Sequence, residues 1–153
     1  MKKKKKDYKF LIVASEFYPN ITKNLVSEAR LHCKKLNIKN EIFFVNGSLE
    51  IPTLIAMKIR KKKYDAVVAL GCIIRGKTKH FDLIASAITD SLLQLSITNA
   101  IPVTNAVLTC DNMKQAAIRS SKKMILLTNT EWKFIGLDAY DISIVETRLL
   151  SDV

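Results

Sequence analysis

The order of apolar segments along the chain is the strongest constraint on its fold. Four short apolar runs of strand length alternate with stretches in which apolar residues recur at helical spacing. The runs cover residues 10–14, 41–45, 66–70 and 103–109. Because continuous apolar runs are typical of strands buried on both faces, this order predicts a parallel sheet with helices on both sides.

The segments between the runs carry helix signals. Residues 20–36 place one apolar stripe on a helix, made of Ile21, Leu25, Val26, Ala29, Cys33 and Leu36. A second helix is expected to begin near Pro52, because a proline is tolerated in the first turn. A third is expected over about 81–96, and a fourth from Asp111, as its N-cap, to about residue 122. A final helix is expected over about 136–150.

Length and composition indicate one domain. With 153 residues and 48% hydrophobic content, the chain can bury one core, and no internal boundary is visible. We expect a disordered basic tail over residues 1–8 and a single domain over 9–153. No apolar run approaches the ~20 residues of a membrane span, and the lysine-rich start does not resemble a signal peptide. Cys33, Cys72 and Cys110 lack zinc-ligand spacing, so we expect no metal site, no disulfide framework and a cytoplasmic location.

The net charge of +11 raises the question whether the chain binds nucleic acid. The distribution of this charge along the sequence bears on that question. Two lysine-rich runs, residues 2–6 and 58–63, hold nearly all the excess, and the rest of the chain is close to neutral. We interpret the first run as a solvated tail and the second as a helix end, where cations complement the helix dipole. Neither run has interleaved aromatic residues for base stacking, so we do not expect nucleic acid as a partner.

Chemically useful side chains follow each of the four expected strands. The carboxyl ends of parallel strands meet at one edge of a sheet, where ligands bind in α/β folds. The loop after the third strand has a glycine, two lysines and a threonine, and ends at His80 at the start of a helix. This is the layout of an anion site beside an acid–base group, since the ordinary pKa of histidine lies near about 6.5. His32 lies within a helix, where a structural or surface role is the better interpretation.

Several of these residues also admit ordinary structural roles. Thr78 would serve equally as a helix cap, and Phe17, directly after a strand, would serve as a core residue. Ile73 and Ile74 are equally good core residues by composition. The residue types alone therefore leave these alternatives open.

Short motifs at the four strand ends occur in a fixed order along the chain. They are Ser15-x-Phe17, Gly47-Ser48-Leu49-Glu50-Ile51-Pro52, Ile74-Arg75-Gly76-x-Thr78-x-His80-Phe81-Asp82, Ile101-Pro102-Val103, Val107-Leu108-Thr109 and Asn112-x-x-Gln115-Ala116. Each is weak alone, but their order and spacing together are specific. Over residues 10–119 the chain resembles the lumazine synthase family, which acts in riboflavin biosynthesis.

The resemblance implies a flavodoxin-like three-layer sandwich with a four-stranded parallel sheet and helices on both faces. It implies a transferase that condenses 5-amino-6-(D-ribitylamino)uracil with 3,4-dihydroxy-2-butanone 4-phosphate. The products are 6,7-dimethyl-8-ribityllumazine, phosphate and water, and no cofactor or metal is required. Family members assemble as pentamers, sometimes twelve of them in a shell, with the site at subunit interfaces.

The resemblance also implies roles for residues on the phosphate side of the site. His80 matches the histidine responsible for proton transfer. Thr78 matches the segment that receives the substrate phosphate. Lys77 departs from the family pattern, because relatives usually carry small or hydroxyl residues there, and its charge would either strengthen anion binding or face water. Arg119 matches an arginine that one subunit contributes to clamp the phosphate in its neighbour's site.

Further positions match the side of the site that holds the pyrimidine. Phe17 matches the aromatic residue that stacks on the ring. Ser48, Leu49 and Glu50 match the turn that holds the uracil and ribityl groups. The expected wall of the pocket and the remaining substrate-binding positions are Cys72, Ile73 and Ile74.

Three departures from the family pattern fall on surfaces between subunits, and the first two lie on the neighbour's side of the site. Asn105, a candidate substrate-binding residue, stands where relatives usually present an aromatic side chain. Ile118 stands where an acidic residue commonly precedes the arginine, and residues 120–134 replace a shorter glycine-rich stretch. Because that stretch lies where pentamers touch in family shells, we expect a pentamer or a pair of pentamers. The same departures leave an alternative function: a flavin- or lumazine-binding assembly with weak or no catalysis.

Overall fold

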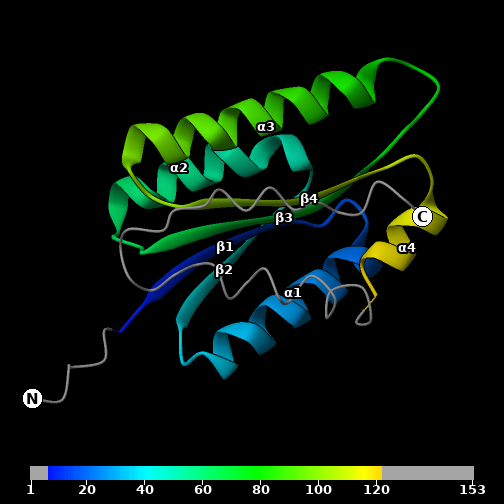
Figure 1. Ribbon diagram of the computed structural model, residues 1–153. Coiled ribbons are helices and arrows are strands. Elements are labelled where there is room, and N and C mark those ends of the chain that lie inside the picture. The colour runs from blue at the N-terminus through cyan, green and yellow to red at the C-terminus, as the bar shows by residue number, and fades with distance from the viewer. Residues whose placement is uncertain (1–6, 122–153) are drawn as a thin grey trace, which may run out of the picture.

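The structure, a computed structural model, describes residues 7–121 as a sheet between two layers of helices (Figure 1). The elements are β1 (Lys9–Ser15), α1 (Pro19–Lys35), β2 (Lys39–Val45), the 3₁₀ helix η1 (Ser48–Glu50), α2 (Ile51–Lys61), β3 (Ala66–Ile74), α3 (His80–Asn99), β4 (Val103–Cys110) and α4 (Met113–Arg119). The strand and helix pattern of the sequence is thus confirmed over these residues.

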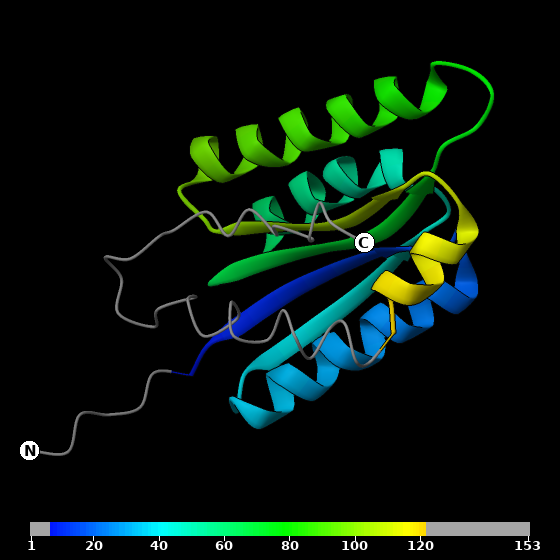
Figure 2. The same ribbon diagram turned by 45° about the vertical axis from the view of Figure 1, so that its right-hand side comes forward.

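All four strands are parallel and lie in the order β2-β1-β3-β4. α2 and α3 cover one face of the sheet, and α1 and α4 cover the other (Figures 1 and 2). The chain adds β2 on one side of β1 and then β3 and β4 on the other side. This change of direction places a topological switch point between β1 and β3. The expected three-layer parallel α/β architecture is confirmed.

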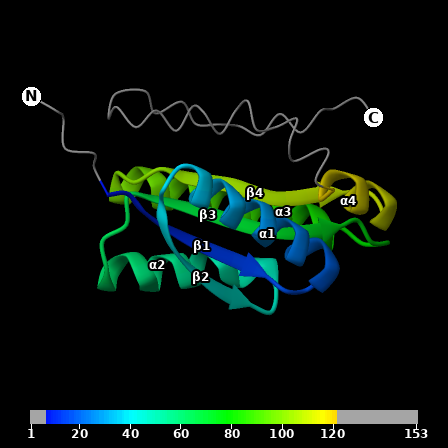
Figure 3. The same cartoon turned by 90° about the horizontal axis from the view of Figure 1, so that it is seen from below.

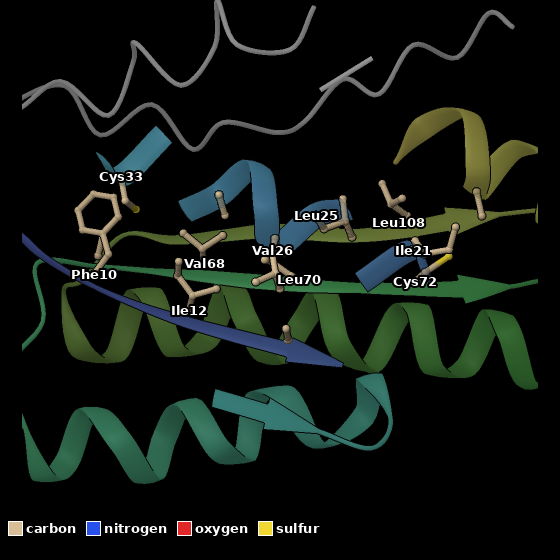
Figure 4. Close-up of a cluster of buried hydrophobic side chains, with 14 of the residues drawn as sticks. Phe10, Ile12, Ile21, Leu25, Val26, Cys33, Val68, Leu70, Cys72 and Leu108 are labelled. Carbon is tan, nitrogen blue, oxygen red and sulfur yellow. The ribbon is translucent and has the colours of Figure 1, made fainter. Parts of the chain in front are cut away.

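Alternation along the strands divides the apolar residues between two cores. In β1, Phe10, Ile12 and Ala14 face α1 and α4, whereas Leu11 and Val13 face α2 and α3. Figure 4 shows the first core, in which strand residues meet the apolar stripe of α1, and Figure 3 views the sheet from that side. The stripe read from the sequence is therefore the buried face of α1, apart from Leu36, which caps the helix and is exposed.

Several boundaries differ by a few residues from the sequence expectation, most clearly those of β3 and α4. β3 continues to Ile74 instead of ending near residue 70, because Cys72 and Ile74 continue the ladder opposite Leu108 and Cys110. The N-cap of α4 is Asn112 and not Asp111. The Asn112 side chain accepts the N–H of Gln115 at 3.0 Å. The helix expected over 136–150 lies outside the described residues.

A cluster of charged and phenolic groups joins three elements at the amino ends of the strands. The Glu41 carboxylate on β2 accepts hydrogen bonds from Lys9 on β1 at 2.8 Å and from the Tyr64 hydroxyl, before β3, at 2.5 Å. Lys62, directly after α2, forms an ion pair with the same carboxylate. These contacts lower the pKa of Glu41 to about 2. The cluster ties the end of the sheet opposite to the candidate site.

The expected tail overlaps the described residues only at Asp7 and Tyr8. The Tyr8 carbonyl accepts the N–H of Lys39 at 3.0 Å, and Asp7 pairs with the Lys39 ammonium at 3.0 Å. Within residues 7–121, no helix has the length and apolar character needed to cross a membrane.

Candidate functional site

The candidate site lies at the carboxyl edge of the sheet, where the strand arrowheads end on the right of Figure 1. Four segments reach this edge: the β1–α1 loop, η1 with the turn before it, the β3–α3 loop and the β4–α4 loop. The structure therefore brings together the four strand-end segments that were expected to converge.

The β1–α1 loop follows a buried residue and carries an exposed aromatic side chain. Ser15 is buried at the end of β1, and its carbonyl accepts a hydrogen bond from the Thr22 hydroxyl on α1. The Phe17 side chain is 66% exposed and packs edge-to-face on Tyr18, with the ring centroids 5.0 Å apart. Phe17 is thus not a core residue. Its ring is presented to the site edge, where a flat ligand could stack on it.

The first turn after β2 places Ser48 under the site. Its hydroxyl is buried and has no hydrogen-bond partner among residues 7–121. It lies against β3, since a Cβ on Gly71 would come within 2.9 Å of the Ser48 Oγ. Gly71 and Ser15 lie on the two strands that flank the switch point, and the Ser48 hydroxyl lies beside them; we call this buried position the floor of the site.

The next two residues of η1 face outward. Leu49 is exposed, and the Glu50 carboxylate accepts the backbone N–H of Gly47 at 2.7 Å. The Glu50 N–H donates in turn to the Gly47 carbonyl at 3.3 Å. This reciprocal pair fixes the carboxylate beside the turn, where the second oxygen can accept a hydroxyl from a ligand.

The β3–α3 loop leads directly into the N-terminus of a 20-residue helix. His80 is the first residue of α3 and is exposed, and its N–H donates to the Thr78 hydroxyl at 3.4 Å. Lys77 and Lys79 are exposed on the same loop. Exposed N–H groups and the positive end of the helix dipole favour an anion here, next to the imidazole.

Arg75, the first residue of that loop, connects the segments on its two sides. Its Nε donates to the Asp111 carboxylate at 3.1 Å, and its Nη1 donates to both oxygens of Asp82 at 3.0 and 3.1 Å. The guanidinium carbon lies 4.2 Å from the centre of the Phe81 ring. These two carboxylates raise the pKa of Arg75, so its charge is fixed.

Arg119, the last residue of α4, turns back to the end of β4. Its Nη1 donates to the Thr109 carbonyl at 3.0 Å. Beneath it lie the buried thiols of Cys72 and Cys110. A hydrogen bond from Cys72 and the charge of Arg119 lower the pKa of the Cys110 thiol. The Arg119 guanidinium is therefore held at the same edge as the four loops, by the Thr109 carbonyl and by the Cys110 sulfur.

Comparison with known proteins identifies the family. The family model for 6,7-dimethyl-8-ribityllumazine synthase matches residues 7–134. The chain belongs to this family.

Individual relatives agree with the family match. A 6,7-dimethyl-8-ribityllumazine synthase of Acidovorax sp. (strain JS42) is 31% identical over 145 residues, covering 93% of this chain and 86% of the relative. That of Methylorubrum populi is 37% identical over 115 residues, covering 72% and 68%. That of Limosilactobacillus reuteri is 35% identical over 113 residues, covering 73% and 74%. The resemblance read from the motifs is confirmed.

Within this lumazine synthase family member, the expected site residues divide into two groups. Phe17, Ser48, Glu50, Thr78 and His80 lie at the carboxyl edge of the sheet, in the β1–α1 and β3–α3 loops, in η1 and at the start of α3. Asn105 lies further back, in the first half of β4, where it faces the Thr89 hydroxyl of α3 at 3.4 Å. Within this chain it is apart from the loop residues.

The three residues at the end of β3 differ in what they can offer a ligand. Cys72 is only 3% exposed and belongs to the core beneath α1 and α4. Ile73 belongs to the opposite core, and Ile74, partly buried, is the last residue of the strand. The Cys72 side chain is therefore part of the core in this chain.

Sequence reasoning missed the connections of Arg75. The motif placed this arginine in the loop, but its partners Asp82 and Asp111 lie seven and 36 residues away. Asp111 had a competing interpretation as a helix cap. Only the β3–β4 pairing brings it next to Arg75, whose N–H donates to the Cys110 carbonyl at 2.9 Å.

Proposed function

We propose that this chain catalyses the condensation of 5-amino-6-(D-ribitylamino)uracil with 3,4-dihydroxy-2-butanone 4-phosphate. The products are 6,7-dimethyl-8-ribityllumazine, phosphate and water. The observation that carries this proposal is family membership over residues 7–134. The comparisons give no support to the alternative of a flavin-binding assembly without catalysis.

The residues at the site edge suit this chemistry. Imine formation, phosphate elimination and ring closure need orientation, proton transfer and a seat for an anion more than a strong nucleophile. His80, exposed at the start of α3, is our candidate for moving protons. Thr78 and the helix N-terminus are our candidates for receiving the phosphate, with Lys77 adding positive charge nearby.

The pyrimidine substrate fits the opposite side of the same edge. We assign the exposed Phe17 ring to stacking on the uracil, and the Glu50 carboxylate to the ribityl hydroxyls. Ser48, buried with no partner in residues 7–121, offers its hydroxyl and backbone at the floor. Leu49, Cys72, Ile73 and Ile74 complete the proposed set of contacts.

Assembly as a homo-oligomer follows from the family, and its size is part of the proposal. Asn105 and Arg119 are assigned to the site of a neighbouring subunit. We propose a pentamer or a pair of pentamers instead of a 60-subunit shell, because residues 120–134 depart from the family pattern. Light scattering should give a mass well below one megadalton, and a mass near that value would contradict this. The three free thiols suit a reducing compartment, and we place the activity in the cytoplasm.

A turnover assay with both substrates tests the activity. We expect lumazine absorbance to rise well above the uncatalysed background, and His80→Ala to slow it by about 10²-fold or more, the usual contribution of a positioned acid–base group. His32→Gln is the matched control, because His32 lies near the end of α1, at the opposite edge of the sheet, and should keep its rate. Wild-type protein that forms product no faster than background would refute the proposal.

A further inference from the structure

We propose that Arg75 is a positioning residue that fixes the shape of the anion-binding loop without contacting the substrate. This inference rests on the proposed function, because it assigns the loop to the phosphate of one substrate. Arg75 directly follows the last residue of β3 and begins the loop.

The side-chain contacts of Arg75 connect the two ends of the β3–α3 loop to each other and to the β4–α4 loop. The bond from Nη1 to Asp82, in the first turn of α3, spans the loop 76–79 and His80. The bond from Nε to Asp111 joins the same guanidinium to the residue before the α4 cap. One rigid, planar group thus links the segment that carries His80 to the segment that leads to Arg119.

The loop itself has few other constraints. Within residues 7–121, the only side-chain hydrogen bond of residues 76–79 is the one that Thr78 accepts from His80. A Cβ on Gly76 would meet nothing within 4 Å, so the loop is not held by packing at that point. The geometry of its backbone N–H groups therefore depends on how its two ends are held.

Global stability is a poor explanation for the network. The Arg75, Asp82 and Asp111 side chains are 44%, 57% and 64% exposed, and ion pairs this exposed contribute little to folding. Stacking of the guanidinium on Phe81, which is itself partly buried, instead fixes the plane in which both carboxylates bind. The arrangement favours local order over net stabilisation.

Direct binding of phosphate by Arg75 is also a poor explanation. Its charge is already opposed by two carboxylates, so the group as a whole carries excess negative charge. Such a group does not attract an anion. Arg75 acts on the anion site through the loop that it holds.

The test uses Arg75→Lys, which keeps the charge but loses the planar fork. We expect the Kd for inorganic phosphate, measured by calorimetry, and the KM for the butanone phosphate to rise about fivefold, the factor that corresponds to ~1 kcal/mol. The KM for the pyrimidine substrate and the unfolding midpoint should stay unchanged. Because the charge is kept, high salt should not abolish the difference. Asp7→Asn, which removes an exposed ion pair at the other end of the sheet, should leave all these values unchanged.

A double-mutant cycle separates positioning from direct contact. Asp82→Asn should weaken phosphate binding like Arg75→Lys, and the two changes together should cost less than their sum. If Arg75 contacts phosphate itself, Asp82→Asn would leave binding unchanged or tighten it, and the inference would be wrong. Unchanged phosphate Kd and KM in Arg75→Lys would also overturn it. Phosphate calorimetry needs no turnover, so wild-type protein that binds phosphate but forms no lumazine would overturn only the proposed function.

Discussion

The backbone N–H of Gly47 donates to the Glu50 carboxylate at 2.7 Å, and the Glu50 N–H donates back to the Gly47 carbonyl at 3.3 Å. These two hydrogen bonds stabilise the N-terminus of η1, because each residue accepts a hydrogen bond from the backbone N–H of the other. It holds a carboxylate at the site edge before any ligand arrives. Such preorganisation lowers the cost of ordering the side chain on binding.

Gly47→Ala should disturb this carboxylate specifically. A Cβ at position 47 would lie 2.7 Å from the Glu50 Oε2, whereas the backbone, at φ −119°, accepts any residue. We expect the KM for the pyrimidine substrate to rise severalfold with little change in the free energy of unfolding, because only a flexible side chain must move. Steady-state kinetics checks this. Glu50→Gln, which keeps an acceptor oxygen, should have the smaller effect, and an unchanged KM in Gly47→Ala would contradict the assignment of Glu50.

Gly71→Ala should destabilise the floor of the site. The new Cβ would come within 2.9 Å of the Ser48 Oγ and 3.4 Å of both Ile51 and Ser15, in the buried part of β3. We expect a loss of about 1–3 kcal/mol in the free energy of unfolding, as for other overpacked cores. Chemical denaturation at fixed protein concentration measures it.

Two further variants test the cause of that loss. Adding Ser48→Ala to Gly71→Ala removes the oxygen in the way and should restore part of the stability. Gly76→Ala, where a Cβ would meet nothing within 4 Å, should cost little stability. Equal losses at Gly71 and Gly76 would show that the close approach of Ser48 is not the reason.

Glu41→Gln should change how stability depends on pH. Hydrogen bonds from Lys62, Lys9 and Tyr64 lower the pKa of Glu41 from 4.5 to about 2 in the folded protein. A lowered carboxyl pKa stabilises the fold above the unfolded value, and this contribution is lost as pH falls through the folded value. The difference in unfolding free energy between wild type and Glu41→Gln should therefore be full above about pH 5. It should shrink between pH 4.5 and about 2.

The measurement is denaturant unfolding of both proteins across that range. Asp7→Asn is the control, since it removes a more exposed ion pair at the same end of the sheet and should have a smaller effect. A difference that stays constant from pH 6 to pH 2 would contradict the assignment.

Ala100→Gly should stabilise the chain. Ala100 follows α3 with φ 47° and ψ 44°, the left-handed conformation that costs an alanine about 1 kcal/mol relative to glycine. Denaturant unfolding should show a gain of that order. Asn37, with φ 56°, is the matched position, and Asn37→Gly should gain less because asparagine tolerates this region. A larger gain at Asn37 would contradict the backbone argument.

The sequence predicted the layers of this fold but not all of its boundaries. Apolar runs and the stripe of α1 report burial directly, so their positions could be read from spacing. The end of β3 could not, because Gly71 interrupts the apolar run and only pairing with β4 shows that the strand continues. Asp111 and Asn112 are both ordinary cap residues, and only the structure shows that Asn112 caps α4 while the Asp111 carboxylate pairs with Arg75.

The same reasoning explains which site residues could be predicted. Thr78 lies in a loop after a strand and His80 begins the next helix, a local pattern visible in the sequence. The exposure of Phe17 was ambiguous from its residue type and was settled by its place on the β1–α1 loop. The Arg75 network depends on contacts across the sheet, for which no local pattern exists.

β1 and β3 each have a strand on both sides, whereas β2 and β4 have a partner on one side only within residues 7–121. Amide hydrogens of the two inner strands should therefore exchange with solvent only through global opening, and those of the loop 76–79 through small local fluctuations. Ser15 and Gly71, under the site, belong to the inner strands. Within residues 7–121, the floor of the site should thus open to solvent more rarely than the loop above it.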